Sequence, residues 1–111
     1  MKAKTSLLKS NGRYSAYQIV YYMYQYSSCF PVFYQVVRTS DKSVWVTPIG
    51  KMNYNYSPGG GSYKTEPSPG SIQGKTKRLS IRPDGYAYIT YYGHLQRLDI
   101  WDGKPVDCFS D

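Results

Sequence analysis

Few side chains in this sequence have the chemistry and the spacing that catalysis requires. His94 is the only histidine, and a histidine base needs a nucleophile or water beside it and a group that orients it. Cys29 could be that nucleophile, but no local pattern joins the two residues, and the glycine before His94 favours a turn. Asp99 and Asp102 could form a carboxylate pair, yet Asp102 precedes a glycine in a typical turn sequence. The sequence therefore predicts that the protein is not an enzyme.

Cofactor-binding signals are equally weak. Residues 70–76, Gly-Ser-Ile-Gln-Gly-Lys-Thr, resemble a phosphate-binding loop. That loop requires four residues between its glycines and a buried strand before it, whereas here three residues intervene and Pro69 precedes the first glycine. A structural zinc site needs more Cys and His ligands than the two cysteines and one histidine of this chain. We expect neither a metal nor another cofactor.

Tyrosine is the most unusual component of the chain. There are 14 Tyr among 111 residues, against 3 Phe and 2 Trp. A tyrosine ring buries a large apolar area but keeps a hydroxyl that needs a hydrogen-bond partner. Because a domain of this size builds only one modest core, some of these rings should lie on a surface that contacts another molecule.

The charge of the chain points to an anionic partner. The net charge is +7, and it is unevenly spread: residues 1–82 hold 12 Lys and Arg against 2 acids, and residues 83–111 hold 2 against 5. A positive field raises affinity for nucleic acid or for an acidic protein surface. Solubility alone would also explain a basic composition. The charge therefore indicates a class of partner but does not identify the partner.

The order of apolar and turn-forming residues predicts an all-β protein with one domain over residues 1–111. No stretch keeps a helical period, and β-forming runs alternate with turns. We expect about six short antiparallel strands in a bent sheet or small barrel, with a four-residue turn at 39–42 and with Pro48 ending the third strand. The expected strands cover residues 16–26, 32–38, 43–47, 77–82 and 86–92, followed by short segments near 98–101 and 106–109.

Residues 50–76 differ from the rest of the sequence. They contain a run of three glycines and several prolines but few aliphatic residues. Such a composition predicts a long flexible loop, and long loops often carry function. This loop is also basic and bears several tyrosines.

Partner-binding candidates follow from these patterns. Basic residues on the outer face of 77–82 would alternate with tyrosine rings if 86–92 pairs beside it, and that combination suits single-stranded nucleic acid. The same pairing is an ordinary way to stabilise a sheet surface. The candidates are Arg78, Arg82, Lys75, Lys77, Tyr86 and Tyr88 at this edge, Trp45 on the third strand, and Tyr54, Tyr56, Tyr63 and Lys64 in the loop.

The cysteines and the N-terminal residues indicate a cytoplasmic protein. Cys29 and Cys108 could pair, but one distant pair is not a disulfide framework. Residues 1–10 lack the apolar core of a secretory signal, and no apolar run is long enough to span a bilayer. We therefore expect reduced thiols and no membrane partner.

Five pieces of the sequence, which leave out the central loop, form a recognisable set: Tyr21-Tyr22 with Tyr26, Phe33 to Arg38, Ser43 to Val46, Pro48 to Lys51, and Leu98 to Pro105. Together they resemble small uncharacterised proteins encoded by bacteriophages and mobile elements. The resemblance implies no particular activity and transfers no site residues. It implies a small, non-enzymatic accessory protein, and some proteins of this size and origin, including anti-CRISPR inhibitors, block host defence nucleases.

The leading hypothesis from the sequence is an inhibitor of a host defence nuclease complex that acts in the host cytoplasm. Its partner would be a host protein or ribonucleoprotein complex, contacted through a Tyr-rich surface that gives large contact area at low entropy cost. An alternative is a direct nucleic-acid-binding protein that uses a basic, Tyr-rich sheet face. A third is a structural or assembly component. The sequence leaves the oligomeric state open.

Overall fold

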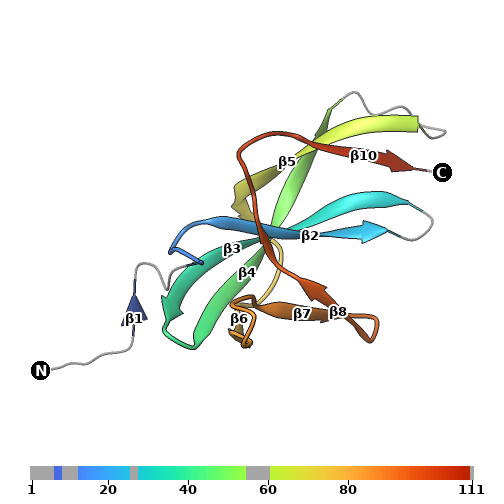
Figure 1. The fold of residues 1–111 in the computed structure, drawn as a ribbon. Helices are drawn as coiled ribbons and strands as arrows, with labels where there is room; N and C mark the ends of the chain where they lie inside the picture. The colour runs from blue at the N-terminus through green and yellow to red at the C-terminus, as the bar shows by residue number, and fades with distance from the viewer. Residues whose placement is uncertain (1–6, 9–12, 26–27, 55–60, 111) are drawn as a thin grey trace, which may run out of the picture.

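The computed structural model describes residues 7–8, 13–25, 28–54 and 61–110. These ranges contain ten strands and no helix, which confirms the predicted all-β class (Figure 1). There are more strands than expected, and three of them run for 12 residues. The strands are β1 (Leu7–Leu8), β2 (Ile19–Gln25), β3 (Cys29–Ser40), β4 (Ser43–Tyr54), β5 (Gly61–Ile72), β6 (Lys77–Ser80), β7 (Tyr88–Tyr91), β8 (His94–Arg97), β9 (Asp99–Ile100) and β10 (Val106–Ser110).

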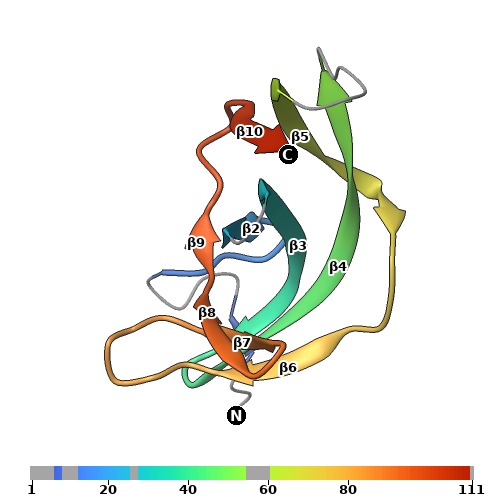
Figure 2. The same ribbon diagram turned by 90° about the vertical axis from the view of Figure 1, so that its right-hand side faces the viewer.

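Four strands close into a small antiparallel barrel in the order β3, β4, β5 and β10. β4 pairs with β3 along one edge and with β5 along the other, and β10 pairs with β5. Within the described ranges one residue pair, Phe109 with Cys29, joins β10 to β3 and completes the ring. Figure 2 shows β10 beside β5 at the top of the barrel. β2, β9 and β1 extend the sheet from β3, and β6 extends it from β4.

The core lies between the β2–β3–β4 part of the sheet and the hairpin formed by β7 and β8. Alternation of side chains across a strand is clearest in β4, where Val44 and Val46 are fully buried and Trp45 between them is only half-buried. The expected strand at residues 43–47 is therefore confirmed as the start of β4. The buried members of the core are Tyr14, Val20, Tyr22, Tyr34, Val36, Val44, Val46, Ala87, Ile89 and Leu98.

The expectation of one long loop over residues 50–76 is wrong. β4 continues through Pro48 to Tyr54, and β5 occupies Gly61–Ile72. Pro48 does not end the strand because its carbonyl accepts a hydrogen bond from the Gln73 amide, away from β3. The N–H that proline lacks therefore removes no bond from the β3–β4 ladder. Residues 55–60 lie outside the described residues, and 73–76 form a short connection to β6.

Two irregularities in the pairing shape the barrel wall. The register of β3 and β4 shifts between Val36 and Arg38. In the β4–β5 ladder, Ile49 pairs with Ile72 but the next residue, Gly50, pairs with Ser68, so residues 69–71 bulge from β5. The ladder of β3 with β4 ends at Tyr34 and Pro48. Beyond that point β4 curves away from β3 toward β5 (Figure 2). A cleft lined by residues of both strands lies there.

Candidate partner-binding surface

Three side chains form a row across neighbouring strands on the side of the sheet away from the core. Trp45 of β4 pairs in register with Arg38 of β3 on one side and with Arg78 of β6 on the other. Residues that pair in an antiparallel ladder point to the same face. We call Arg38, Trp45 and Arg78 the tryptophan row.

Both arginines of the tryptophan row lie against the indole ring. The guanidinium carbon of Arg38 is 4.3 Å from the ring centroid and that of Arg78 is 5.7 Å away. These distances are typical of cation–π contacts. The Arg78 Nε also donates a hydrogen bond of 3.2 Å to the Ser43 hydroxyl. In the part of the chain that the structure describes, neither arginine forms an ion pair, so both keep charge and donor groups for a partner.

A second group of basic and aromatic side chains, the tyrosine cluster, surrounds the turn between β6 and β7. The guanidinium carbons of Arg13 and Arg97 lie 3.7 Å and 4.4 Å from the centroid of the Tyr86 ring. Arg82 lies 5.1 Å from the centroid of the Tyr88 ring. The cluster thus consists of these three arginines and two tyrosines.

Two acids balance part of the charge of the tyrosine cluster. Asp99 forms an ion pair with Arg97, with 2.8 Å between the Arg97 Nε and the Asp99 Oδ1. Asp84 accepts a hydrogen bond from the Tyr88 hydroxyl, and this bond lowers the pKa of Asp84 and raises the pKa of Tyr88. With three arginines against two acids, the cluster remains weakly positive, whereas the tryptophan row holds two arginines without a paired acid among the described residues.

The segment 77–82 connects the two groups. Leu79 and Ile81 pack against the core, so Arg78 and Arg82 point outward from the same segment, roughly 13 Å apart along an extended chain. The outward basic edge expected from the sequence is therefore present. Tyr86 and Tyr88 lie beside it, but both rings are already in cation–π contact with arginines.

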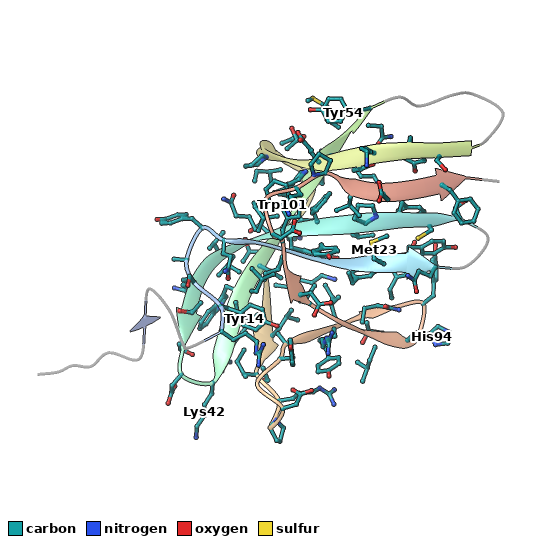
Figure 3. The ribbon with its side chains drawn as sticks, turned by 45° about the horizontal axis from the view of Figure 1, so that its top comes forward. Tyr14, Met23, Lys42, Tyr54, His94 and Trp101 are labelled. Atoms are coloured by element: carbon teal, nitrogen blue, oxygen red, sulfur yellow. The ribbon has the colours of Figure 1, made fainter. Side chains whose placement is uncertain are left out.

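The remaining predicted site residues lie elsewhere or are already paired. Tyr54 is at the opposite end of β4 from the turn that carries Lys42 (Figure 3), and its hydroxyl donates to Glu66. Lys64 forms an ion pair with Asp107. Tyr63 is buried, which leaves little of its ring for a partner. Tyr56 lies outside the described residues. Lys75 is exposed just before β6, and Lys77 is exposed as the first residue of β6.

Sequence reasoning missed three arginines of this surface. The expected four-residue turn at 39–42 gives the wrong register for Arg38. The turn has only two residues, Asp41 and Lys42. The shorter turn moves Arg38 directly opposite Trp45. Arg13 and Arg97 reach Tyr86 through tertiary contacts, for which the local sequence holds no signal.

The residues considered for catalysis lie on different strands. His94 is exposed at the start of β8, at the tip of the hairpin (Figure 3), and Asp99 is paired with Arg97. Cys29 and Cys108 are free thiols. Because Cys29 pairs in register with Phe109, the neighbouring Cys108 points to the other face of the strand. Over the described ranges, no three His, Cys, Asp or Glu side chains gather in a group suited to a metal ion.

Comparison with known proteins identifies no relative. No protein-family model matches the chain, and neither the curated proteins nor the solved structures include a match. Within the described residues there is no helix of the length and apolar character that crossing a membrane requires.

Proposed function

We propose that this protein binds single-stranded nucleic acid without catalysis, through the tryptophan row and the adjoining tyrosine cluster. The observation that carries the proposal is the register of Arg38, Trp45 and Arg78 across three strands. Single-strand-binding surfaces combine cationic groups for the phosphates with flat groups on which bases stack. This row supplies both on one face.

An arginine that stacks on tryptophan can still bind nucleic acid. A guanidinium that lies flat on an aromatic ring keeps its N–H donors in its own plane, where phosphate oxygens can accept them. Unstacked bases also stack on guanidinium planes as they do on aromatic rings. Arg38, which lies closer to the indole than Arg78, would place a base on its outer plane and extend the stack that Trp45 begins.

The test is binding to labelled single-stranded and duplex DNA and RNA at two salt concentrations, followed by fluorescence polarisation. We expect single strands to bind more tightly than duplexes, with affinity that falls as salt rises. Replacing Arg38 and Arg78 together by alanine should reduce the slope of log affinity against log salt by about 1.4, since each phosphate contact on a single strand contributes about 0.7.

A matched control removes the same charge elsewhere. The double variant Lys64→Ala with Lys104→Ala also loses two positive charges, but from β5 and from the turn before β10. It should keep the wild-type slope to within a few tenths. Equal loss in both double variants would mean that net charge, not the tryptophan row, determines binding, and the proposal would be wrong.

Inhibition of a host defence nuclease complex remains the second candidate, and one observation favours a protein partner. Tyr92 and Leu95 are exposed at the tip of the β7–β8 hairpin, with 82% and 52% of their surface accessible, and tyrosine is a frequent anchor of protein interfaces. This candidate predicts no binding to free nucleic acid at low salt and a stable complex with a purified effector that Tyr92→Ala weakens. The phage origin that it assumes rests on the sequence resemblance alone.

A further inference from the structure

The cleft where β3 and β4 separate has the composition of a small-molecule site. Its volume is about 360 Å³, and its walls are residues 31–33 of β3, residues 49–51 of β4, and three residues of the β5 bulge and the segment after it, Ser68, Ser71 and Gln73. A volume of this size is at the lower end of the range for organic ligands. One wall is apolar and the other is polar, so an occupant would have two chemically different ends.

Among the described residues that line the cleft, Lys51 is the only cationic one. Its ammonium donates a hydrogen bond of 3.1 Å to the carbonyl oxygen of Pro31 and lies 4.1 Å from the centroid of the Phe30 ring. These contacts hold the ammonium beside β3 and leave further N–H donors, because a lysine ammonium has three. Partial burial lowers the pKa of Lys51, but the residue as a whole is exposed, so its charge can be reached from solvent. In the described part of the chain no carboxylate forms an ion pair with it, and its ammonium can therefore pair with an incoming anion.

The polar wall is arranged to donate hydrogen bonds. The Gln73 side-chain amide donates to the Ser71 hydroxyl oxygen over 2.9 Å. The Ser71 oxygen is therefore an acceptor in this bond, and its own O–H stays available as a donor. Gly50 brings the backbone of β4 against this wall, because a Cβ at residue 50 would lie 2.8 Å from the Ser71 oxygen and 3.2 Å from the Gln73 nitrogen.

The apolar wall favours an occupant that has an organic part. Phe33 and Ile49 are almost completely buried, with 1% and 6% of their surface exposed, and they line the cleft together with Pro31 and Val32. These side chains are already nearly dry, so the wall offers a low-polarity contact rather than a large wet apolar surface. An apolar or aromatic group attached to the anion would lie against this wall and gain dispersion contacts that a bare phosphate at Lys51 would not make.

We propose that this cleft binds a small organic oxyanion, a phosphate or carboxylate that carries an apolar or aromatic group, with the oxyanion at Lys51 and Ser71 and the apolar group against Phe33 and Ile49. The proposal stands independently of nucleic-acid binding at the tryptophan row. Phosphate esters and carboxylates share the oxyanion chemistry that the lining recognises, and the probes below separate them.

The test titrates the protein with phenyl phosphate, benzoate, inorganic phosphate and benzyl alcohol, and follows backbone amide shifts by NMR. We expect at least one of the two aromatic anions to bind, with shifts concentrated at residues 31–33, 49–51 and 71–73. Inorganic phosphate and the uncharged benzyl alcohol should bind more weakly than that anion. Binding by phenyl phosphate alone would indicate a phosphate ester as the natural ligand, and binding by benzoate alone would indicate a carboxylate; both support the proposal.

Two variants and one control make the test specific. Lys51→Met keeps the length of the side chain and removes its charge, and it should weaken the bound aromatic anion by roughly tenfold to a hundredfold. Gly50→Ala should reduce binding by crowding Ser71 and Gln73. Lys64→Met removes a lysine that is outside the cleft and should bind as the wild type does.

Three results would overturn the proposal. These are no shifts at the cleft with either aromatic anion at millimolar concentration, equal binding by wild type and Lys51→Met, and inorganic phosphate binding as tightly as the aromatic anions. If Gly50→Ala does not fold, Lys51→Met together with the map of amide shifts still decides the question.

Discussion

The buried hydroxyl of Tyr14 donates a hydrogen bond of 2.7 Å to the carbonyl oxygen of Leu98, 84 residues further along the chain. The same hydroxyl oxygen accepts a hydrogen bond of 2.9 Å from the backbone N–H of Ala87. A further bond of 3.0 Å joins the N–H of Leu98 to the carbonyl of Ala87. One tyrosine thus fixes both ends of the β7–β8 hairpin to the segment that precedes β2.

Replacing Tyr14 by phenylalanine should lower the free energy of unfolding by about 2–4 kcal/mol, because it leaves a buried donor and a buried acceptor without this partner. Urea unfolding followed by tryptophan fluorescence would measure the change. Tyr17→Phe is a matched control, since Tyr17 is 77% exposed and the loss of its hydroxyl should change stability by less than about 0.5 kcal/mol. Equal stability of Tyr14→Phe and wild type would contradict the role of this hydroxyl.

The same tyrosine predicts loss of stability in alkali. Burial raises the pKa of Tyr14 from 10.0 to about 12. Because the folded state holds the phenol proton more tightly than the unfolded state does, this contribution to stability is complete below pH 10 and is lost as the pH rises toward 12. Burial also raises the pKa of Tyr22 and Tyr34, so their effects act in the same direction.

Urea unfolding at pH 8, 10 and 11 would measure this dependence. Wild type should become progressively less stable above pH 10, and Tyr14→Phe should lose less between pH 10 and 11 than wild type loses. An identical pH dependence in the two proteins would show that Tyr14 is not among the groups responsible.

Tyr92 predicts a stabilising substitution. Tyr92 and Gly93 form the two-residue turn of the β7–β8 hairpin, with positive φ angles of 49° and 79°. Such turns favour Asn-Gly, and a bulky residue in the left-handed region is strained. Tyr92→Asn should raise the free energy of unfolding by about 0.5–1 kcal/mol.

The control for this turn is Gly93→Ala. No atom of the described residues beyond its chain neighbours lies within 4 Å of the Cβ position at Gly93, so the cost of the alanine comes from the backbone conformation, about 1 kcal/mol. Urea unfolding of both variants would measure the two effects. A destabilised Tyr92→Asn would mean that the contact of the Tyr92 ring with Tyr91, at 4.5 Å between centroids, outweighs the strain.

Replacing Trp45 should weaken binding in a different way from replacing the two arginines. Trp45→Leu keeps an apolar residue in β4 but removes the ring, and it should weaken single-strand binding by about 1–3 kcal/mol per stacked base. The salt dependence should stay unchanged, since no charge is lost. Fluorescence polarisation at several salt concentrations separates the two effects, and Trp101→Leu serves as the matched control on the segment after β9.

Local patterns in the sequence were sufficient for part of this fold. The alternation around Trp45 identified Val44 and Val46 as one face, because a strand places neighbouring side chains on opposite sides. The turn at residues 83–85 was also predictable, since Asp84 accepts the backbone N–H of Tyr86 and Gly85 adopts a φ of 87°.

The rest depends on partners that lie far away in the sequence. Pro48 looked like the end of a strand, and only the position of Gln73 makes it harmless within β4. Only part of the tyrosine cluster was predictable. Arg82 and Tyr88 lie near one another in the sequence, whereas Arg13 reaches Tyr86 only in the folded protein. The cleft at Lys51 exists because β3 and β4 take different partners after Tyr34 and Pro48, which no local pattern states.

The closing of the barrel by Phe109 and Cys29 has a consequence for the order of folding. The two residues of this pair are 80 positions apart in a chain of 111, and contacts of such long sequence separation form slowly because a large loop must close first. Until β10 arrives, β5 and the Cys29 end of β3 are open strand edges, and open edges can pair with other chains. An incompletely folded chain would expose these edges to other chains, so lowering the growth temperature during expression should increase the soluble yield.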